Sequence, residues 1–430
     1  MDTRDAKCAA FFARHNFDSA APSVEHAAAA LWYDLKLGLE AVELPHTQEM
    51  LPTWITVQKP LDKTIIVLDA GGTNFRSFLI ELRDGQANVL KEKKGKLPAL
   101  ETELTKDEFF ESLAESIDYI KDAASEINFC FAYALEMTME KDARVLRMSK
   151  EVQVAGILNA PVGASLFDAL QKRGWKKLKK VSVINDTAAA LLSGLSLNKT
   201  YSAYIGMILG TGFNIAYTES KPIPKLSAKE QLLGQIVVCE TAKTNRVVSS
   251  DFDTQLRAST IDGNVCKLEK MCSGAYLGEL ISIAYQCASA EDLFTEKVSQ
   301  KLSTEHFDFK TINEFLVGEN SAKNKLSQIL ESSHATEDDI YVIREIAVQF
   351  LKRTARIVAS ALISVALKTE QGRNASTPIC IAAEGTTFSK AFLLKHEVLA
   401  ILKEELTKKH GIFFELHEIG NAVALGTAFF

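Results

Sequence analysis

The segment LDAGGTN, which follows the apolar run IIVL, combines residue types that can bind a phosphate group. After Asp69 and Ala70 come two glycines and two short polar residues: Gly71, Gly72, Thr73 and Asn74. The glycines permit positive φ, so that successive backbone N–H groups can form a concave anion site. Asp69 would repel a phosphate unless a divalent cation lies between them, as in enzymatic phosphoryl transfer. Taken alone, these residues also suit an ordinary tight turn after a capped strand.

A second loop, LGTGFN (209–214), repeats this chemistry later in the chain. Thr211, Gly212 and Asn214 again place glycine and short polar residues where one strand turns back on the next. Two hairpin loops that face each other could hold the phosphates of a nucleotide from both sides. The alternative is a pair of unrelated glycine turns.

Asp186, in the segment VSVINDTAAALL, is a candidate general base. It lies just beyond the carboxyl end of an apolar run, at the edge where ligands of α/β sheets bind. Phosphoryl transfer to an alcohol needs a carboxylate within hydrogen-bond reach of the hydroxyl proton. The residues alone favour a different interpretation, because Asp186 and Thr187 both suit the N-cap of the next helix.

The composition argues against several other classes of protein. A chain of 430 residues predicts two domains, and its net charge of −6 argues against a nucleic-acid-binding face. The seven cysteines form no C-x-x-C pair, which argues against a zinc site and favours a reducing compartment. None of the eight histidines stands in a metal-binding or Ser/His/Asp pattern, and no Walker A sequence is present. The N-terminus has no apolar signal region, so we expect a cytoplasmic location.

The elements that must position these motifs repeat in the two halves of the chain. The first half predicts strands at 63–70, 76–82, 86–94, 127–135 and 180–186, with helices at 106–124, 163–173 and 187–195. The second half predicts strands at 203–210, 213–219, 235–240, 377–385 and 411–419, with helices at 390–406 and 421–430. Both halves have the order β-β-β-α-β-α-β-α, so the sequence predicts an α/β protein with a duplicated topology.

Residues 342–368 predict a long amphipathic helix and not a membrane span. Five charged residues interrupt the apolar pattern: Arg344, Glu345, Lys352, Arg353 and Arg356. The apolar residues fall on one stripe, so we expect this helix at the centre of a large domain. We also expect a helix at 23–42, an exposed loop at 220–229 and a peripheral helical insertion at 299–325.

Six segments resemble motifs of the eukaryotic-type hexokinase family, within the actin-like ATPase superfamily. They are LDAGGTNFR, VINDTAAALL, GMILGTGFNIAY, VCET, MCSGAYLGEL and AAEGTTFSK. The first and third resemble phosphate motifs, the second a catalytic Asn-Asp-Thr segment, and the last an adenosine motif with Glu384 in place of the usual Asp. Each motif is weak alone, but all six occur in order and at fitting intervals over nearly the whole chain.

The resemblance implies two RNase H-like (actin-like ATPase) α/β domains that flank a central cleft. The small domain should comprise 60–187, and the large domain 1–59 and 188–420. The last helix, 421–430, could pack back on the small domain.

The resemblance also implies roles for individual residues. Asp186 would be the catalytic base, and Lys150 would contact the transferred phosphoryl group. The substrate-binding residues would be Ser149, Lys150, Asn185, Asp186, Asn214, Glu240 and Glu279. The nucleotide-binding residues would be Asp69, Gly71, Gly72, Thr73, Asn74, Arg76, Thr211, Gly212, Gly385 and Thr386, with Mg²⁺ held by Asp69 through water.

Three of these residues have plainer interpretations. Glu240 and Glu279 each end an apolar stretch and are expected to face a cleft, although Glu240 by itself would equally suit the surface. Lys150 by itself would be an ordinary solvated lysine.

One segment departs from the family pattern. The family carries Phe-Ser-Phe-Pro, whose Ser contacts the sugar, followed by a Thr-Lys pair seventeen residues after that Ser. Here FAYA places Ala132 and Ala134 at the Ser and Pro positions, while Ser149 and Lys150 keep the spacing. This change bears on sugar affinity and sugar choice more than on the reaction.

The implied function is ATP-dependent phosphorylation of a hexose, with glucose phosphorylated at its 6-hydroxyl in the first step of glycolysis. ATP and Mg²⁺ would be required, the partners would be small molecules without nucleic acid or membrane, and the chain would be a monomer or homodimer. Two alternatives remain open. One is a non-catalytic sugar or nucleotide sensor, which the two alanines make plausible. The other is an actin- or chaperone-like ATPase, which would need neither IND nor SGAYLGE.

Overall fold

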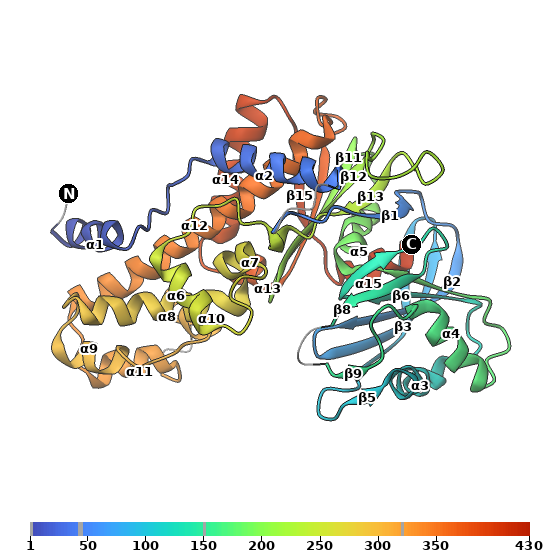
Figure 1. Ribbon diagram of the computed structural model, residues 1–430, viewed down its shortest axis with the longest axis horizontal. Helices are drawn as coiled ribbons and strands as arrows, with labels where there is room; N and C mark the ends of the chain where they lie inside the picture. The colour runs from blue at the N-terminus through green and yellow to red at the C-terminus, as the bar shows by residue number, and fades with distance from the viewer. Residues whose placement is uncertain (1–2, 42–45, 149–151, 320–321) are drawn as a thin grey trace.

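The computed structural model of the chain describes residues 3–41, 46–148, 152–319 and 322–430. It contains two α/β bodies, each built on its own sheet (Figure 1). The five-stranded sheet, with strands β2 to β10, belongs to the body at the lower right of Figure 1. The six-stranded sheet lies beside the long helix α12 in the other body.

The five-stranded sheet has the order β10-β6-β2-β3-β4. Its strands are β2 (Lys63–Gly71), β3 (Asn74–Arg83), β4 (Gln86–Lys96), β6 (Glu126–Phe131) and β10 (Lys180–Ile184). Strands β2 to β4 form an antiparallel meander, and β6 and β10 continue the sheet in parallel with β2. The central strand β2 is buried from Ile65 to Ala70, as expected for a strand covered on both faces.

The six-stranded sheet has the order β1-β13-β12-β11-β14-β15. Its strands are β1 (Leu51–Thr56), β11 (Ala203–Leu209), β12 (Phe213–Glu219), β13 (Gln235–Val238), β14 (Ile379–Glu384) and β15 (Phe414–Glu418). Strands β11 to β13 repeat the antiparallel meander, and β14 and β15 repeat the parallel extension. The predicted topological repeat is therefore present, and β1 adds an unpredicted antiparallel edge strand.

The helices α3 (Lys106–Ser116) and α4 (Val162–Lys172) cover one face of the five-stranded sheet. Two short strand pairs complete this body: β5 (Leu104–Thr105) with β9 (Val154–Ala155), and β7 (Ala134–Met137) with β8 (Ala143–Arg147). Two helices lie between the sheets: α5 (Asp186–Ser193), which follows β10, and α15 (Ala422–Phe429), which follows β15.

The second body holds the remaining helices. They are α1 (Thr3–Arg14), α2 (Val24–Leu39), α6 (Asp251–Ser259), α7 (Lys267–Cys272), α8 (Gly274–Ala290), α9 (Glu296–Leu302), α10 (Phe309–Val317), α11 (Lys325–Ser332), α12 (Glu337–Thr369), α13 (Thr386–Lys390) and α14 (Leu394–Leu402). The predicted amphipathic helix is α12, which begins at a capping box formed by Thr336 and Asp339. In the parts of the chain that the structure describes, every helix is too short or too polar to cross a bilayer.

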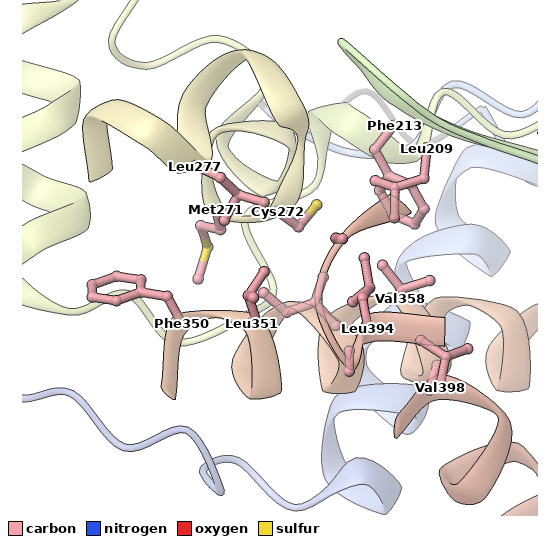
Figure 2. Close-up of a cluster of buried hydrophobic side chains, with 14 of the residues drawn as sticks. Leu209, Phe213, Met271, Cys272, Leu277, Phe350, Leu351, Val358, Leu394 and Val398 are labelled. Carbon is pink, nitrogen blue, oxygen red and sulfur yellow. The ribbon is translucent and has the colours of Figure 1, made fainter. Parts of the chain in front are cut away.

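Helix α12 anchors the second glycine loop to the core. Its apolar face packs with α7, α8 and α14, and the cluster reaches the strand ends on either side of the loop (Figure 2). Leu209 and Phe213, which flank the loop, are both buried in this cluster. The loop therefore stands on a rigid base although its own residues are small.

The helices α5 and α15 can approach their neighbours closely because two glycines lie at the contacts. A Cβ added to Gly426 of α15 would lie 1.7 Å from the Ala189 carbonyl oxygen of α5. A Cβ added to Gly206 of β11 would lie 2.6 Å from the Thr187 carbonyl oxygen. On its other side α15 packs on Ile65 and Val67 of β2. The two helices thus join the two sheets.

Three predicted elements differ from the structure. The strand expected at 127–135 is split into β6 and β7, because the chain bends at Ala132 and Tyr133. The helix expected at 106–124 ends at Ser116 and is followed by a 3₁₀ turn (Asp118–Ile120). The helix expected at 390–406 is α14, which begins after Leu393 adopts a left-handed conformation (φ 53°) and continues as a π-helix (Lys403–Lys409).

Candidate functional site

Two neighbouring cavities open where the strands of the two sheets end. The first, of about 430 Å³, is lined by residues of both bodies: Asp69, Gly71, Asn74, Arg76, Lys94, Gly95, Ala132, Asp186, Ile208, Glu384, Gly385 and Val423. The second, of about 790 Å³, lies between α8, α10 and α13 and includes Thr211, Gly274, Phe309, Asn313, Thr386 and Thr387. We call them the phosphate cavity and the distal cavity. Carboxyl ends of strands from two sheets therefore meet at one place, as expected for a ligand site in α/β proteins.

Asp69 and Arg76 form an ion pair at the wall of the phosphate cavity. They face each other across the β2–β3 ladder, and Arg76 Nε donates to Asp69 Oδ2 at 2.8 Å. Asp69 is 6% exposed. Burial raises the pKa of its carboxyl group, and the neighbouring guanidinium opposes that change. Of the other predicted residues of this loop, Gly71 and Asn74 line the cavity, while Gly72 and Thr73 are exposed beside it at the tip of the hairpin.

Asp186 lies at the start of α5 and reaches the same cavity. The N-cap of α5 is Asn185, whose Oδ1 accepts the Thr187 N–H at 2.9 Å. The capping role that the residues alone favoured for Asp186 therefore belongs to Asn185, and Asp186 is the first helical residue. Asp186 Oδ1 accepts the same N–H at 2.7 Å. Burial, with the charge of Asp69 as a smaller cause, raises the pKa of Asp186 to about 6 although the hydrogen bonds from Thr187 oppose this.

Asn214 and Glu240 form a second polar pair on the side of the six-stranded sheet. The Asn214 amide donates to Glu240 Oε1 at 3.0 Å, and its own carbonyl oxygen accepts the Ile215 N–H at 2.8 Å. These bonds fix the orientation of both side chains. Burial raises the pKa of Glu240 to about 7, and the negative charges of Asp186 and Glu269 add to this effect.

The structure adds Glu269 of α7 to this group, a residue that the sequence analysis missed. Its Oε2 accepts the Phe213 N–H at 3.0 Å, just beyond the second glycine loop. A Cβ added to Gly212 would lie 2.7 Å from the same oxygen, so the glycine makes room for the carboxylate. The sequence signal was available, because Glu269 lies four residues before Ser273, the first residue of the SGAYLGE motif.

Glu279, which the sequence analysis assigned to the sugar together with Glu240, contacts His306. Both of its carboxylate oxygens lie 2.9 Å from His306 Nδ1. Gly274, on the same helix, faces the second glycine loop, and five residues correspond to a rotation of roughly 140° around a helix. The first turn of the SGAYLGE motif therefore contacts the second glycine loop, while its glutamate contacts His306.

The second glycine loop is held by the starts of two helices. The Gly274 N–H of α8 and the Thr387 hydroxyl of α13 both donate to the Gly210 carbonyl oxygen, each at 2.8 Å. Thr211 and Thr386, both predicted to bind nucleotide, line the distal cavity, while Gly385 lines the phosphate cavity. The two cavities are thus separated by this loop and the turn after β14.

The segment that departs from the family pattern lies at the phosphate cavity. Ala132 lines it, and the Ala132 N–H donates to the Ala70 carbonyl oxygen at 2.9 Å. Lys94 of β4, which the sequence analysis did not single out, lines the same cavity. The predicted residues Ser149 and Lys150 lie outside the described residues.

Glu384 supplies a third carboxylate to the phosphate cavity. Its Oε2 accepts the Val423 N–H at the start of α15 at 2.9 Å. Burial raises its pKa, with smaller contributions from the charges of Asp69 and Asp186. Asp69, Asp186 and Glu384 thus surround one cavity, and Arg76 is the cation paired with one of them. Such an arrangement can attract a cation and can accept a proton.

Sequence profiles described as hexokinase match the chain at residues 13–195 and 204–430. Mouse Hexokinase-1 is 25% identical over 403 residues, which cover 87% of this chain and 40% of the mouse protein. Potato Hexokinase-2 is 25% identical over 325 residues, which cover 70% of this chain and 65% of the potato protein. The chain therefore spans less than half the length of the mouse relative.

Solved structures show the same fold. Hexokinase from Schistosoma mansoni, complexed with glucose, superimposes with a TM-score of 0.78 at 20% identity and covers 99% of this chain and 98% of that one. A second crystal structure of hexokinase gives a TM-score of 0.81 at 19% identity, with 100% and 99% covered. The two sheets, the paired glycine loops and the two profile matches lead to one conclusion: this chain belongs to the hexokinase family.

Proposed function

We propose that this chain is an ATP-dependent hexokinase that transfers the γ-phosphoryl group to the 6-hydroxyl of a hexose, with glucose as the first candidate and glycolysis as the pathway. The observation that carries the proposal is the position of Asp186. Its half-buried carboxyl group, with a pKa of about 6, lines the same cavity as the Asp69–Arg76 loop. A base of this pKa is ionised at neutral pH and still basic enough to take a proton.

The proposed reaction is a direct displacement. The hexose hydroxyl oxygen forms a bond to the γ-phosphorus, the bond from that phosphorus to the bridging oxygen of ADP breaks, and the hydroxyl proton passes to Asp186. The protein contributes mainly position and electrostatics, because this transfer requires little covalent chemistry from the enzyme.

We assign the sugar to the polar group on the side of the six-stranded sheet. Asn214 is held by its own backbone contacts, and it presents Glu240 in a fixed orientation. Glu269 extends this group, and we propose it as a sugar ligand in place of Glu279. Asn185 would act mainly by fixing the start of α5, because its side-chain oxygen is committed to the Thr187 N–H. Ser149 and Lys150 keep their proposed roles from the sequence motif alone.

We assign the nucleotide to the two cavities. The distal cavity, with Phe309, Thr211 and Thr386 in its lining, has room for a base and sugar. The phosphates would extend past Gly385 into the phosphate cavity, toward Gly71, Asn74 and Arg76. Gly385 supports this assignment. Its φ of 123° is a conformation that mainly glycine adopts, and the absence of a side chain lets a phosphate approach the backbone closely.

The residues around the phosphate cavity fit a divalent cation held through water. Three carboxylates with raised pKa values share the cavity, and a cation would relieve their mutual repulsion. No three metal-ligating side chains converge on one point among the described residues, which is compatible with the indirect contact proposed for Asp69. Mg²⁺ bound there would neutralise charge on the phosphates.

An assay of ADP release, with and without glucose and then with a panel of hexoses, tests the proposal. Turnover that depends on the sugar supports a kinase and identifies the hexose. ADP release at the same rate with and without sugar would indicate an ATPase. Sugar binding without turnover would indicate a sensor, which Ala132 favours because it offers no hydroxyl at the cavity wall. A cytoplasmic location is part of the proposal, because all seven cysteines are unpaired thiols.

A further inference from the structure

An ion pair connects the two bodies beside the proposed sugar site. Arg147 Nη2 lies 3.9 Å from Glu240 Oε2. Arg147 ends β8, in a hairpin of the body that holds the five-stranded sheet, whereas Glu240 follows β13 of the six-stranded sheet. The pair therefore spans the space between the bodies.

The hairpin places Arg147 beside the segment in which alanine stands at the family's Ser and Pro positions. Arg147 pairs with Ala134 in the β7–β8 ladder, two residues after Ala132. On this wall Ala132 and Ala134 offer no side-chain donor, whereas the Arg147 guanidinium offers a fork of N–H donors. The Arg147 guanidinium thus lies on the strand that pairs with the segment following the bend at Ala132.

Glu240 needs such a neighbour if it is to act as an acceptor. Its side chain is 15% exposed, and Asp186 and Glu269 place negative charge near it. Asn214 satisfies Oε1, while Oε2 is the oxygen nearest Arg147. Burial raises the pKa of Glu240, and the charge of Arg147 is the first effect that opposes this rise. Arg147 thus favours the ionised carboxylate, which accepts hydrogen bonds from hydroxyl groups.

We propose that Arg147 is a positioning residue that orients Glu240 for the sugar from the opposite wall, and so determines sugar affinity. The inference rests on the proposed function, because it takes Glu240 as a sugar ligand. It predicts an effect on sugar binding and little effect on the nucleotide, because neither cavity that we assign to ATP includes Arg147 in its lining.

Three variants of the full chain test this role. Arg147→Gln removes the charge, and Arg147→Lys keeps it. Arg144→Gln is the matched control, because Arg144 lies on the same strand and its guanidinium contacts the Asn159 carbonyl oxygen instead. Calorimetry gives the glucose Kd without ATP, steady-state kinetics give kcat and both KM values, and thermal unfolding gives Tm.

For Arg147→Gln we expect the Kd and KM for the sugar to rise about 5-fold, which corresponds to the upper range for a partly exposed ion pair. The kcat and the KM for ATP should stay within about twofold of the wild-type values. The Tm should stay within about one or two degrees of the wild-type Tm. Arg147→Lys should recover part of the affinity, and Arg144→Gln should match wild type. In a Glu240→Gln background, Arg147→Gln should have no further effect on sugar binding, because the partner is gone.

Unchanged sugar affinity in Arg147→Gln, or an equal loss in Arg144→Gln, would overturn the role of Arg147. An undiminished effect of Arg147→Gln in the Glu240→Gln background would also overturn it. A wild-type chain that binds glucose without turnover would refute the kinase function alone, and the calorimetric comparison would still decide the role of Arg147. A chain that binds no hexose would overturn both.

Discussion

Asp186 is the residue on which the proposed chemistry depends most directly. Asp186→Asn keeps the size of the side chain and removes the proton acceptor. We expect kcat to fall by about 10²–10⁴, the usual cost of a lost general base, while ATP and glucose still bind. Steady-state kinetics and binding titrations on the same preparation measure both quantities. A variant with near-normal kcat would remove Asp186 from this role.

The pH dependence of the reaction should report two carboxyl groups. Asp186, which faces Asp69 and accepts hydrogen bonds from Thr187, has a pKa of about 6. Because the base acts when it is ionised, kcat should be constant above this pH and fall about tenfold per unit below it. Glu240, with Arg147, Asp186, Glu269 and Asn214 around it, has a pKa of about 7.

As the pH is lowered, Glu240 should therefore become protonated before Asp186. The KM for the sugar should begin to rise first, and kcat should begin to fall at a lower pH. Initial rates from pH 5 to 8.5 at varied glucose concentration separate the two. A kcat that does not change between pH 5 and 7 would contradict the assignment of Asp186.

Ala132 offers a test of whether the hexose also reaches the wall of the phosphate cavity. Ala132→Ser restores a hydroxyl at the phosphate cavity, where position 132 lies beside Gly71. A neutral hydrogen bond contributes about 0.5–1.5 kcal/mol, which corresponds to roughly 2–13-fold in affinity. We expect a lower KM for glucose in this variant with kcat nearly unchanged. An unchanged or higher KM would show that the hydroxyl does not reach the sugar from this position.

At the scale of elements, the second glycine loop depends on close contact with the start of α8. A Cβ added to Gly274 would lie 2.3 Å from the Thr387 hydroxyl oxygen and 2.8 Å from the Gly210 carbonyl oxygen. Gly274→Ala should therefore displace the loop, and overpacking of this kind costs about 1–3 kcal/mol. We expect nucleotide affinity to fall about tenfold while glucose affinity is retained.

Gly420→Ala is the control for this variant. Gly420 has no atom within 4 Å of an added Cβ, so its substitution should leave both affinities unchanged. A Gly274→Ala variant that loses sugar affinity and keeps nucleotide affinity would reverse our assignment of the two ligands.

At the scale of the whole molecule, the helices α5 and α15 connect the proposed base to the joint between the bodies. Asp186 begins α5, and Glu384 of the six-stranded sheet accepts the Val423 N–H in the first turn of α15. A rotation of one body on the other must therefore change the surroundings of Asp186. We expect glucose to bring the bodies together, which would exclude water and limit ATP hydrolysis.

Small-angle X-ray scattering with and without saturating glucose measures this closure as a fall in the radius of gyration. Gly426→Ala should reduce the fall and lower kcat, because an added Cβ would push α15 away from the Ala189 carbonyl oxygen. Circular dichroism and Tm check that the variant is folded. An equal radius of gyration in both states of the wild-type chain would show that sugar binding does not close the cleft.

The sequence by itself determined the family, the α/β class and the repeated strand order, because these follow from local patterns. Apolar runs predicted ten of the strands, and glycine with short polar residues marked where strands turn. Asp69 and Asp186 could be identified because each lies at the end of a predicted strand, and Asn214 because it lies near the start of one. The resemblance to known motifs then supplied roles that the residues alone left open.

Tertiary structure decided which carboxylates lie together. Glu269 and Glu279 are ten residues apart and look equally suitable, but one faces the second glycine loop and the other faces His306. The sequence also could not show that Arg147 approaches Glu240, because that contact joins two bodies and 93 positions of chain, 147 to 240. Local patterns report on neighbours within one element, whereas side chains from different elements meet only after the sheets pack and the helices α5 and α15 join them.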